Sequence, residues 1–202
     1  MATADQPRRM SREARRDQLS KLAVAAVARA GVDGPLMDLV GQQAGVTRNL
    51  LYHYFPRGRQ DLVLAAADEA GRALAEGWVV DEAIPLDQRL QANFARMLEH
   101  ALAPSDAWLT YQHTRTSGDP EVRAVTDSHV DAVVANVARN HLGTPDPPPL
   151  VRAALIGFVS FAEAVLDEVR TQGLPREAVY AVLRRTLVAA VATAREHTPG
   201  ER

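Results

Sequence analysis

The sequence predicts an all-α protein, and three observations support this fold class. Apolar residues recur at intervals of three and four over most of the chain, no segment alternates as a half-buried strand would, and no internal repeat stands out. The hydrophobic content of 47% is ample for a packed core in a chain of 202 residues. We therefore expect a soluble protein built from nine or so helices.

The N-terminal segment is predicted to be an arm followed by one helix. Residues 1–10 place polar and basic residues around Pro7 without an apolar period, so we expect a flexible arm there. Ser11 is a suitable N-cap, apolar residues then recur at helical spacing, and Gly31 ends the run. The first helix should therefore begin just after Ser11 and end just before Gly31.

Two short helices are predicted next, over 36–44 and 47–54, joined by a tight turn. Pro35 suits the start of a helix, and the Thr47 hydroxyl can accept a hydrogen bond from an N–H group of the following first turn. This pattern is a helix-turn-helix, whose second helix can enter a DNA major groove. The residues spaced to pack inward are Met37, Val40, Ala44, Val46, Leu51 and Phe55.

The charge distribution favours a nucleic-acid partner for this end of the chain. The whole chain has a net charge of −2 and a sequence pI near 6.3. Residues 1–60, however, carry ten Lys and Arg against five Asp and Glu, a net of +5, and the other 142 residues carry a net of −7. Positive charge beside a helix-turn-helix is the distribution that phosphate attraction favours, although a solvated basic face would look the same.

Six more helices are expected after Pro56 and Gly58 break the chain. The helix that follows them is long enough, at about 1.5 Å per residue, to connect the head to a second layer. The last two helices have wide apolar stripes, which can belong to the core or pair with a second copy in a four-helix bundle. Apolar spacing and caps place the six at about 60–78, 86–103, 106–116, 120–142, 150–171 and 176–195.

Several other classes of protein lack support. The absence of cysteine excludes a disulfide framework or thiolate metal site and fits the cytoplasm. The six histidines form no metal-binding motif, and no nucleotide-binding or nucleophile motif is present, so we expect no metal, no cofactor and no enzymatic activity. Glu163 and Asp167, four residues apart, are better explained as a solvated face than as a catalytic pair. Neither a signal peptide nor a membrane span is predicted.

The segment AGVTRNLLYHYF at 44–55 resembles the helix-turn-helix of the tetracycline-repressor (TetR) family of bacterial regulators. The likeness covers roughly 12–62 and includes AVARAG at the end of the first helix. It implies a homodimeric DNA-binding repressor whose C-terminal helices form a ligand pocket and the dimer interface. The corresponding domains are 11–58 for DNA binding and 59–202 for ligand binding and dimerisation.

The resemblance implies that Arg48, Asn49 and Tyr52 face base edges or phosphates. It also implies that Thr47, His53 and Tyr54 lie against the DNA backbone. Arginine and asparagine can bond to base edges, and hydroxyl groups can bond to phosphates. The chain departs from the family pattern where Asp38 replaces a basic residue, Leu50 a threonine and Gly58 a lysine. The predicted DNA-binding residues are Arg12, Arg16, Thr47, Arg48, Asn49, Tyr52, His53, Tyr54, Arg57 and Arg59.

The helices after residue 86 carry large apolar side chains with few polar ones, as a small-molecule site requires, although any of them could be plain core. Together with the resemblance they predict a pocket. The predicted ligand-binding residues are Phe94, Met97, Trp108, Tyr111, Gln112, His129, Phe158 and Phe161, with His100, His113, Asn93 and Glu163 as further polar candidates. The predicted dimer-interface residues are Leu155, Val159, Leu166, Val179, Leu183, Leu187 and Val191.

The resulting hypothesis is a cytoplasmic regulator that a small apolar effector releases from a palindromic operator. Effector binding would change the spacing of two DNA-reading helices in the dimer, with the helix over 60–78 as the lever. The alternative is a DNA-binding dimer without a small-molecule ligand, controlled by a protein partner.

Overall fold

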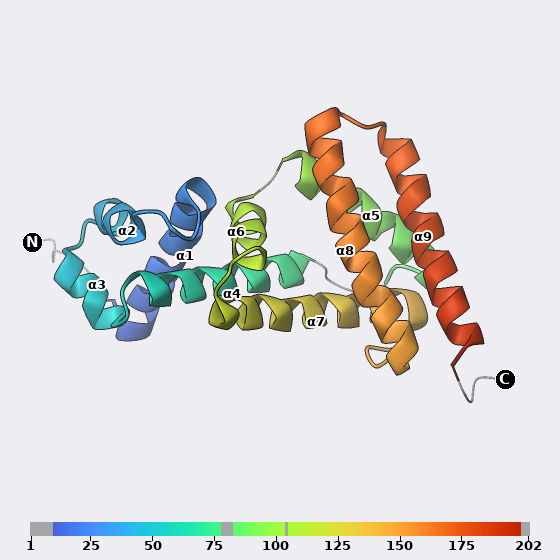
Figure 1. Cartoon of the computed structure of the whole chain (residues 1–202), viewed down its shortest axis with the longest axis horizontal. Helices are drawn as coiled ribbons and strands as arrows, with labels where there is room; N and C mark the ends of the chain where they lie inside the picture. The colour runs from blue at the N-terminus through green and yellow to red at the C-terminus, as the bar shows by residue number, and fades with distance from the viewer. Residues whose placement is uncertain (1–9, 78–82, 104, 199–202) are drawn as a thin grey trace, which may run out of the picture.

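The computed structural model describes residues 10–77, 83–103 and 105–198, and this part of the chain is helical without strands, which confirms the predicted fold class. Apart from Met10, the arm predicted at 1–10 lies outside the described residues. Figure 1 shows α1, α2 and α3 at one end, α4 beside α7 in the middle, and the α8–α9 hairpin at the other end. The described helices are α1 (Arg12–Ala30), α2 (Leu36–Ala44), α3 (Arg48–Tyr54), α4 (Arg59–Gly77), α5 (Leu86–Leu102), α6 (Asp106–Arg115), α7 (Pro120–Leu142), α8 (Pro149–Gln172) and α9 (Arg176–Glu196).

Side chains at the helix starts explain where several helices begin. The hydroxyl groups of Ser11, Thr47 and Ser105 accept hydrogen bonds from the N–H groups three residues later, at 3.1, 3.3 and 3.2 Å. Asp119 caps α7 in the same way with two bonds, of 2.8 and 3.3 Å. The turn between α2 and α3 depends on Gly45, whose φ of +63° lies in the left-handed region.

The first hydrophobic core holds the helix-turn-helix together. Leu51 and Phe55 have no exposed surface, as the sequence predicted. The same core includes Leu62 and Ala66 of α4 and Val122 of α7, so α1, α2 and α3 do not close it by themselves. The predicted domain boundary after residue 58 therefore lies inside a shared core, because the first half of α4 packs in one core with α1, α2 and α3.

The second hydrophobic core lies between α5, α7, α8 and α9. Its side chains have little or no exposed surface within one chain, although Val179 also lines a groove on the outer side of the hairpin. The dimer interface stays a prediction, because helical periodicity marks a buried stripe without showing which neighbour covers it. All seven predicted interface residues are buried here within one chain: Leu155, Val159, Leu166, Val179, Leu183, Leu187 and Val191.

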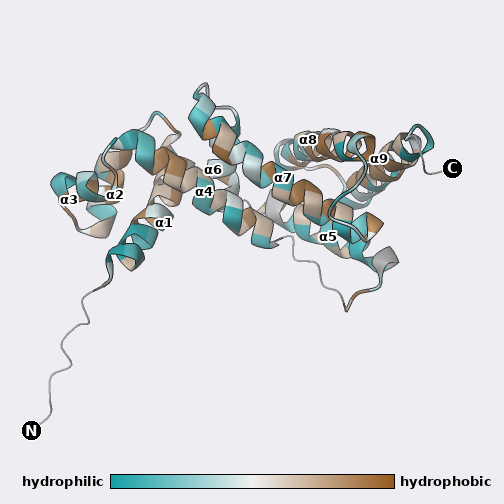
Figure 2. Ribbon diagram, turned by 90° about the horizontal axis from the view of Figure 1, so that it is seen from below, coloured by the Kyte–Doolittle hydropathy of each residue, from teal (hydrophilic) through white to brown (hydrophobic). Residues whose placement is uncertain are grey.

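The outward face of the α8–α9 hairpin is apolar as well. A shallow groove between the two helices is lined by Phe161, Leu174 and Val182, all of them exposed, and a second groove includes Leu150. Figure 2 shows hydrophobic positions along both helices, whereas the end of the head that carries α3 is mostly hydrophilic. Monomeric proteins seldom leave a contiguous apolar face of this kind in contact with water.

One helix is long and apolar enough, by length and composition alone, to cross a membrane. This helix is α8, with 24 residues and a mean hydropathy of 1.7 over its most apolar window. The observation is weak support for a membrane span, because the core helices of soluble proteins pass the same test. In this fold α8 packs against α5, α7 and α9, which accounts for the apolar residues on its inner face.

Candidate nucleic-acid interface and ligand cavity

The exposed face of α3 carries most of the side chains predicted to contact DNA. Leu51 and Phe55 anchor this part of the chain in the core, so the positions between them turn toward solvent. A guanidinium, an amide and aromatic groups with polar atoms are thereby presented on one helix of seven residues. The exposed residues are Thr47, Arg48, Asn49, Leu50, Tyr52 and His53, and Tyr54 is half-buried.

Arg48 has a weak partner in its own chain. Its Nη1 atom lies 3.6 Å from Oδ1 of Asp38 on α2, and both side chains are more than half exposed. An ion pair this exposed contributes little to stability, so Arg48 can exchange it for a guanine edge or a phosphate. Asp38 also adds negative charge next to the face that would meet phosphates.

The ring of Tyr52 packs closely against Gly58. A Cβ atom at Gly58 would lie 3.0 Å from the Tyr52 ring, and the φ of +62° at this position disfavours other residues. The Tyr52 ring can thus fold against the turn that follows α3 while 46% of the residue stays exposed. A side chain at position 58 would therefore require the Tyr52 ring to shift, in addition to the strain of the positive φ.

Arg57 and Arg59, both predicted to contact DNA, are bound to carboxylates of the protein. The Nε atom of Arg57 donates to Asp61 at 2.7 Å, and its two terminal nitrogens donate to the two oxygens of Glu121 at 2.9 and 3.1 Å. These bonds hold the pKa of Glu121 below its ordinary value and raise the pKa of Arg57. Arg59 donates to Asp33 at 2.7 Å.

Arg16 ties α1 to the end of α3. Its Nη1 atom donates to the carbonyl of Tyr54 at 3.1 Å, and its guanidinium carbon lies 5.3 Å from the centroid of the Phe55 ring. A cation in this position interacts favourably with both the helix C-terminus and the ring face. Arg12 lies one turn earlier on α1 and is exposed, so it has fewer constraints from the fold.

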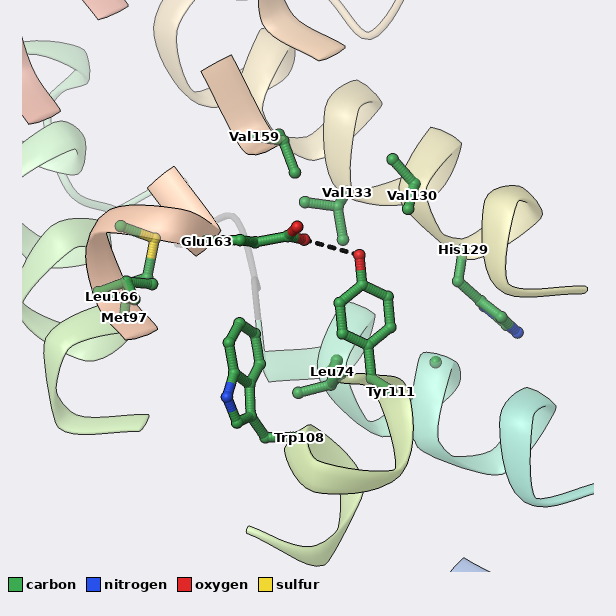
Figure 3. A pocket seen from close by; sticks show the side chains of 11 residues that line it. Leu74, Met97, Trp108, Tyr111, His129, Val130, Val133, Val159, Glu163 and Leu166 are labelled. Atoms are coloured by element: carbon green, nitrogen blue, oxygen red, sulfur yellow. Dashed lines mark hydrogen bonds between the residues drawn. The ribbon is translucent and has the colours of Figure 1, made fainter. Parts of the chain in front are cut away.

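A small, partly open cavity lies between α4, α5, α6, α7 and α8 (Figure 3). Its volume of about 50 Å³ has room for a few water-sized groups. The walls are mainly aliphatic, with aromatic rings contributed by α6. The lining residues are Gly71, Leu74, Met97, Trp108, Tyr111, His129, Val130, Val133, Val159, Glu163 and Leu166.

Glu163 is the charged group of this cavity. It is only 9% exposed, and its Oε1 atom accepts a hydrogen bond of 2.6 Å from the Tyr111 hydroxyl, drawn in Figure 3. Its Oε2 atom forms an ion pair with Arg115, whose other terminal nitrogen donates to Ser160 at 3.0 Å. Burial raises the pKa of the Tyr111 hydroxyl, which therefore remains a donor at neutral pH.

Searches with the sequence match no protein-family model and no curated protein. The fold, by contrast, is similar to that of a TetR-family transcriptional regulator from Streptomyces coelicolor, with a TM-score of 0.75 and 25% sequence identity over 94% of this chain and 85% of that one. The chain has the TetR-family fold. A TetR transcriptional regulator from Rhodococcus sp. RHA1 shares it, with a TM-score of 0.65 and 18% identity over 89% of this chain and 97% of that one.

Within this TetR-family fold, the predicted ligand-binding residues occupy different places. Phe94 and Phe158 are buried in the second core with their ring centroids 6.1 Å apart. Gln112 lines a hollow on the outer side of α6, and Phe161 is exposed on the hairpin. The predicted residues that line the cavity are Met97, Trp108, Tyr111 and His129.

Of the further polar candidates, only Glu163 lines the cavity. Asn93 is buried on α5, and His113 is exposed with its ring near Gly31. The side chain of His100 lies outside the described residues. The partner of Glu163, Arg115, was not predicted, because nothing in the sequence relates a residue at the end of α6 to the middle of α8.

His129 connects the cavity wall to α4. A Cβ atom at Gly71 would lie 2.2 Å from the His129 ring, so the ring of His129 packs directly on the glycine. The Nε2 atom of His129 lies 3.1 Å from Oδ1 of Asp68, one turn earlier on α4. Among the described residues, no group of three His, Asp and Glu side chains is arranged to hold a metal ion.

Proposed function

We propose that the protein is a dimeric, cytoplasmic DNA-binding repressor that leaves a palindromic operator when a small apolar effector occupies the cavity. The observation that carries the proposal is the exposed face of α3, with Arg48, Asn49 and Tyr52 displayed from a helix anchored at Leu51 and Phe55. Arginine can bond guanine bidentately and asparagine can bond adenine, so this face has the donors for base recognition.

The exposed side of the α8–α9 hairpin supports a dimer. A second copy seated on it would cover Phe161, Leu174 and Val182, which otherwise face water. Two copies related by a two-fold axis would also supply the two DNA-reading helices that a palindrome requires, roughly 34–36 Å apart for successive turns of the major groove. The positive charge of residues 1–60 would attract both copies to phosphates.

Footprinting with a randomised operator library tests the DNA-binding part. We expect Arg48→Ala to relax base preference at one position of each half-site and to cost roughly 1–3 kcal/mol of discrimination. Arg12→Ala should weaken binding to all sequences alike and lower the salt dependence by about one phosphate contact. An unchanged base preference for the Arg48 variant contradicts the assignment of α3.

A thermal-shift screen tests the effector part. Any compound that binds the folded protein at about 100 times its dissociation constant should add roughly 2.7 kcal/mol of stability. The cavity of about 50 Å³ must enlarge to hold more than a very small molecule. If no compound class shifts the transition, the protein instead responds to a protein partner.

A further inference from the structure

The buried carboxylate of Glu163 defines the electrostatic character of the cavity. Figure 3 shows it directed into the space between Tyr111, Val133 and Val159. Among the residues that the structure describes, no lysine or arginine lines the cavity, and the remaining walls are aliphatic or aromatic. A ligand carboxylate would face Glu163 and be repelled. A pure hydrocarbon would offer no group that can pair with the Glu163 carboxylate.

An ammonium group fits this environment. It can donate to the Oε2 atom of Glu163, which accepts no hydrogen bond within the described part of the chain and is balanced by Arg115. The rings of Trp108 and Tyr111 line the same space, and aromatic rings attract cations placed over their faces. We propose that the cavity binds a small apolar amine whose ammonium group replaces Arg115 as the charge partner of Glu163, an inference that rests on the proposed effector site.

The exchange keeps Glu163 paired in both states. Removing the charged partner of a buried carboxylate is strongly unfavourable, so an incoming cation must arrive as the arginine leaves. The side chain of Arg115 is 33% exposed, and it borders an open hollow of about 470 Å³ on the outer side of α6. Arg115 can therefore turn into water without becoming a buried unpaired charge itself.

The same movement creates room for the ligand. The cavity and the outer hollow share two wall residues, Trp108 and Glu163, and Arg115 belongs to the hollow. When Arg115 turns outward, the two spaces can join between these residues. The apolar body of the amine would then fill the cavity, and any larger substituent would extend into the hollow.

Loss of the Arg115–Glu163 pair also loosens the last turn of α6 from α8, while Tyr111 in the middle of α6 stays bound to Glu163. Arg115 is the last residue of α6, and Thr110 of the same helix donates to the Val24 carbonyl of α1 at 2.8 Å. Thr110 has no exposed surface, so α6 and the head are joined through a dry contact. An amine that frees the end of α6 can therefore change the position of the head without touching it.

The test uses three probes of nearly the same shape, benzylamine, benzyl alcohol and benzoate, with binding to the full chain measured by calorimetry. Benzylamine should bind about tenfold or more tightly than benzyl alcohol, since its hydrogen bond is charge-assisted, and benzoate should bind least. Glu163→Gln should weaken benzylamine binding about 30-fold or more and leave benzyl alcohol nearly unchanged. Arg115→Met should tighten benzylamine binding, because the competing cation is gone. Glu99→Gln, a matched change on the exposed side of α5, should alter nothing.

Three results overturn the proposal: equal binding of the three probes, preferential binding of benzoate that Arg115→Met abolishes, or no binding at all. If Glu163→Gln fails to fold, the tightening expected for Arg115→Met still decides between an amine and an acid. Operator binding by the same wild-type sample is scored separately. Operator binding without amine binding overturns the amine site and leaves the proposed function. Amine binding without operator binding overturns the proposed function and leaves the amine site.

Discussion

Arg57 and Glu121 join the turn after α3 to the first turn of α7 through two N–H···O bonds of 2.9 and 3.1 Å. Gln60 adds a third connection, since its amide donates to Asp119 at 2.8 Å. The other half of α7 lines the cavity with Val130 and Val133. Helix α7 therefore contacts both the helix-turn-helix head and the cavity. It is a second connection between them, beside α4, which the sequence predicted as the lever.

The first prediction concerns this Arg57–Glu121 contact. Glu121→Gln should preserve operator binding by the effector-free protein but reduce the release caused by a bound effector, because α7 can no longer pull on the turn after α3. The measurement is operator affinity with and without a saturating cavity ligand. Glu177→Gln, on the exposed start of α9, is the control. An unchanged response to the ligand would show that α7 does not transmit the signal.

The second prediction concerns Asp38 on the DNA-facing side. Asp38→Asn should raise DNA affinity, because it removes a negative charge near phosphates and frees Arg48 from its partner 3.6 Å away. The slope of log affinity against log salt should steepen by about one phosphate contact. Asp17→Asn on the exposed side of α1 controls for the change in net charge. Weaker binding would instead mean that Asp38 is needed to position Arg48.

The third prediction concerns the close approach of α4 and α7. Gly71→Ala should destabilise the protein by about 1–3 kcal/mol, because the new Cβ atom would meet the His129 ring rather than the end of a flexible side chain. Adding His129→Ala should recover part of that loss by making room. Urea unfolding of the single and double variants provides the free energies. A double variant no more stable than Gly71→Ala alone would exclude this steric account.

The fourth prediction concerns the proposed dimer. Val182→Asp should convert the protein to a monomer in sedimentation experiments and abolish tight operator binding, because it places a charge in the apolar face of the hairpin. Leu102→Asp, which changes an exposed leucine of α5, should leave the association state as it is. A Val182 variant that still sediments as a dimer would move the interface elsewhere.

The fifth prediction concerns pH. Burial lowers the pKa of His141 to about 4 from an ordinary value of 6.5, so the unfolded chain binds a proton in this window and the folded protein does not. Stability should therefore fall as pH decreases from 6.5, with a loss that reaches about 3 kcal/mol near pH 4. His141→Gln should remove this component, which urea unfolding at several pH values would detect. Parallel curves for the two proteins would show that His141 titrates normally when folded.

The helix-turn-helix and its caps could be predicted from the sequence because they depend on neighbours in the chain. Ser11, Thr47 and Asp119 cap helices through bonds to N–H groups two or three residues away, and the spacing of Leu51 and Phe55 determines which face of α3 is buried. The all-α class and the residues presented by α3 follow from such short-range rules.

Contacts between distant helices were decided only by the tertiary structure. Periodicity identified the inner stripe of the α8–α9 hairpin but left open whether the same chain or a second copy packs on it, and α5 and α7 of the same chain do so. The pairing of Arg115 with Glu163 and of Arg57 with Glu121 depends on which helices cross, and a charge pattern along one helix cannot reveal that. The sequence by itself determined the elements and which residues α3 turns toward solvent. The packing of the helices decided what lines the cavity, what else remains exposed and which arginines are already bound.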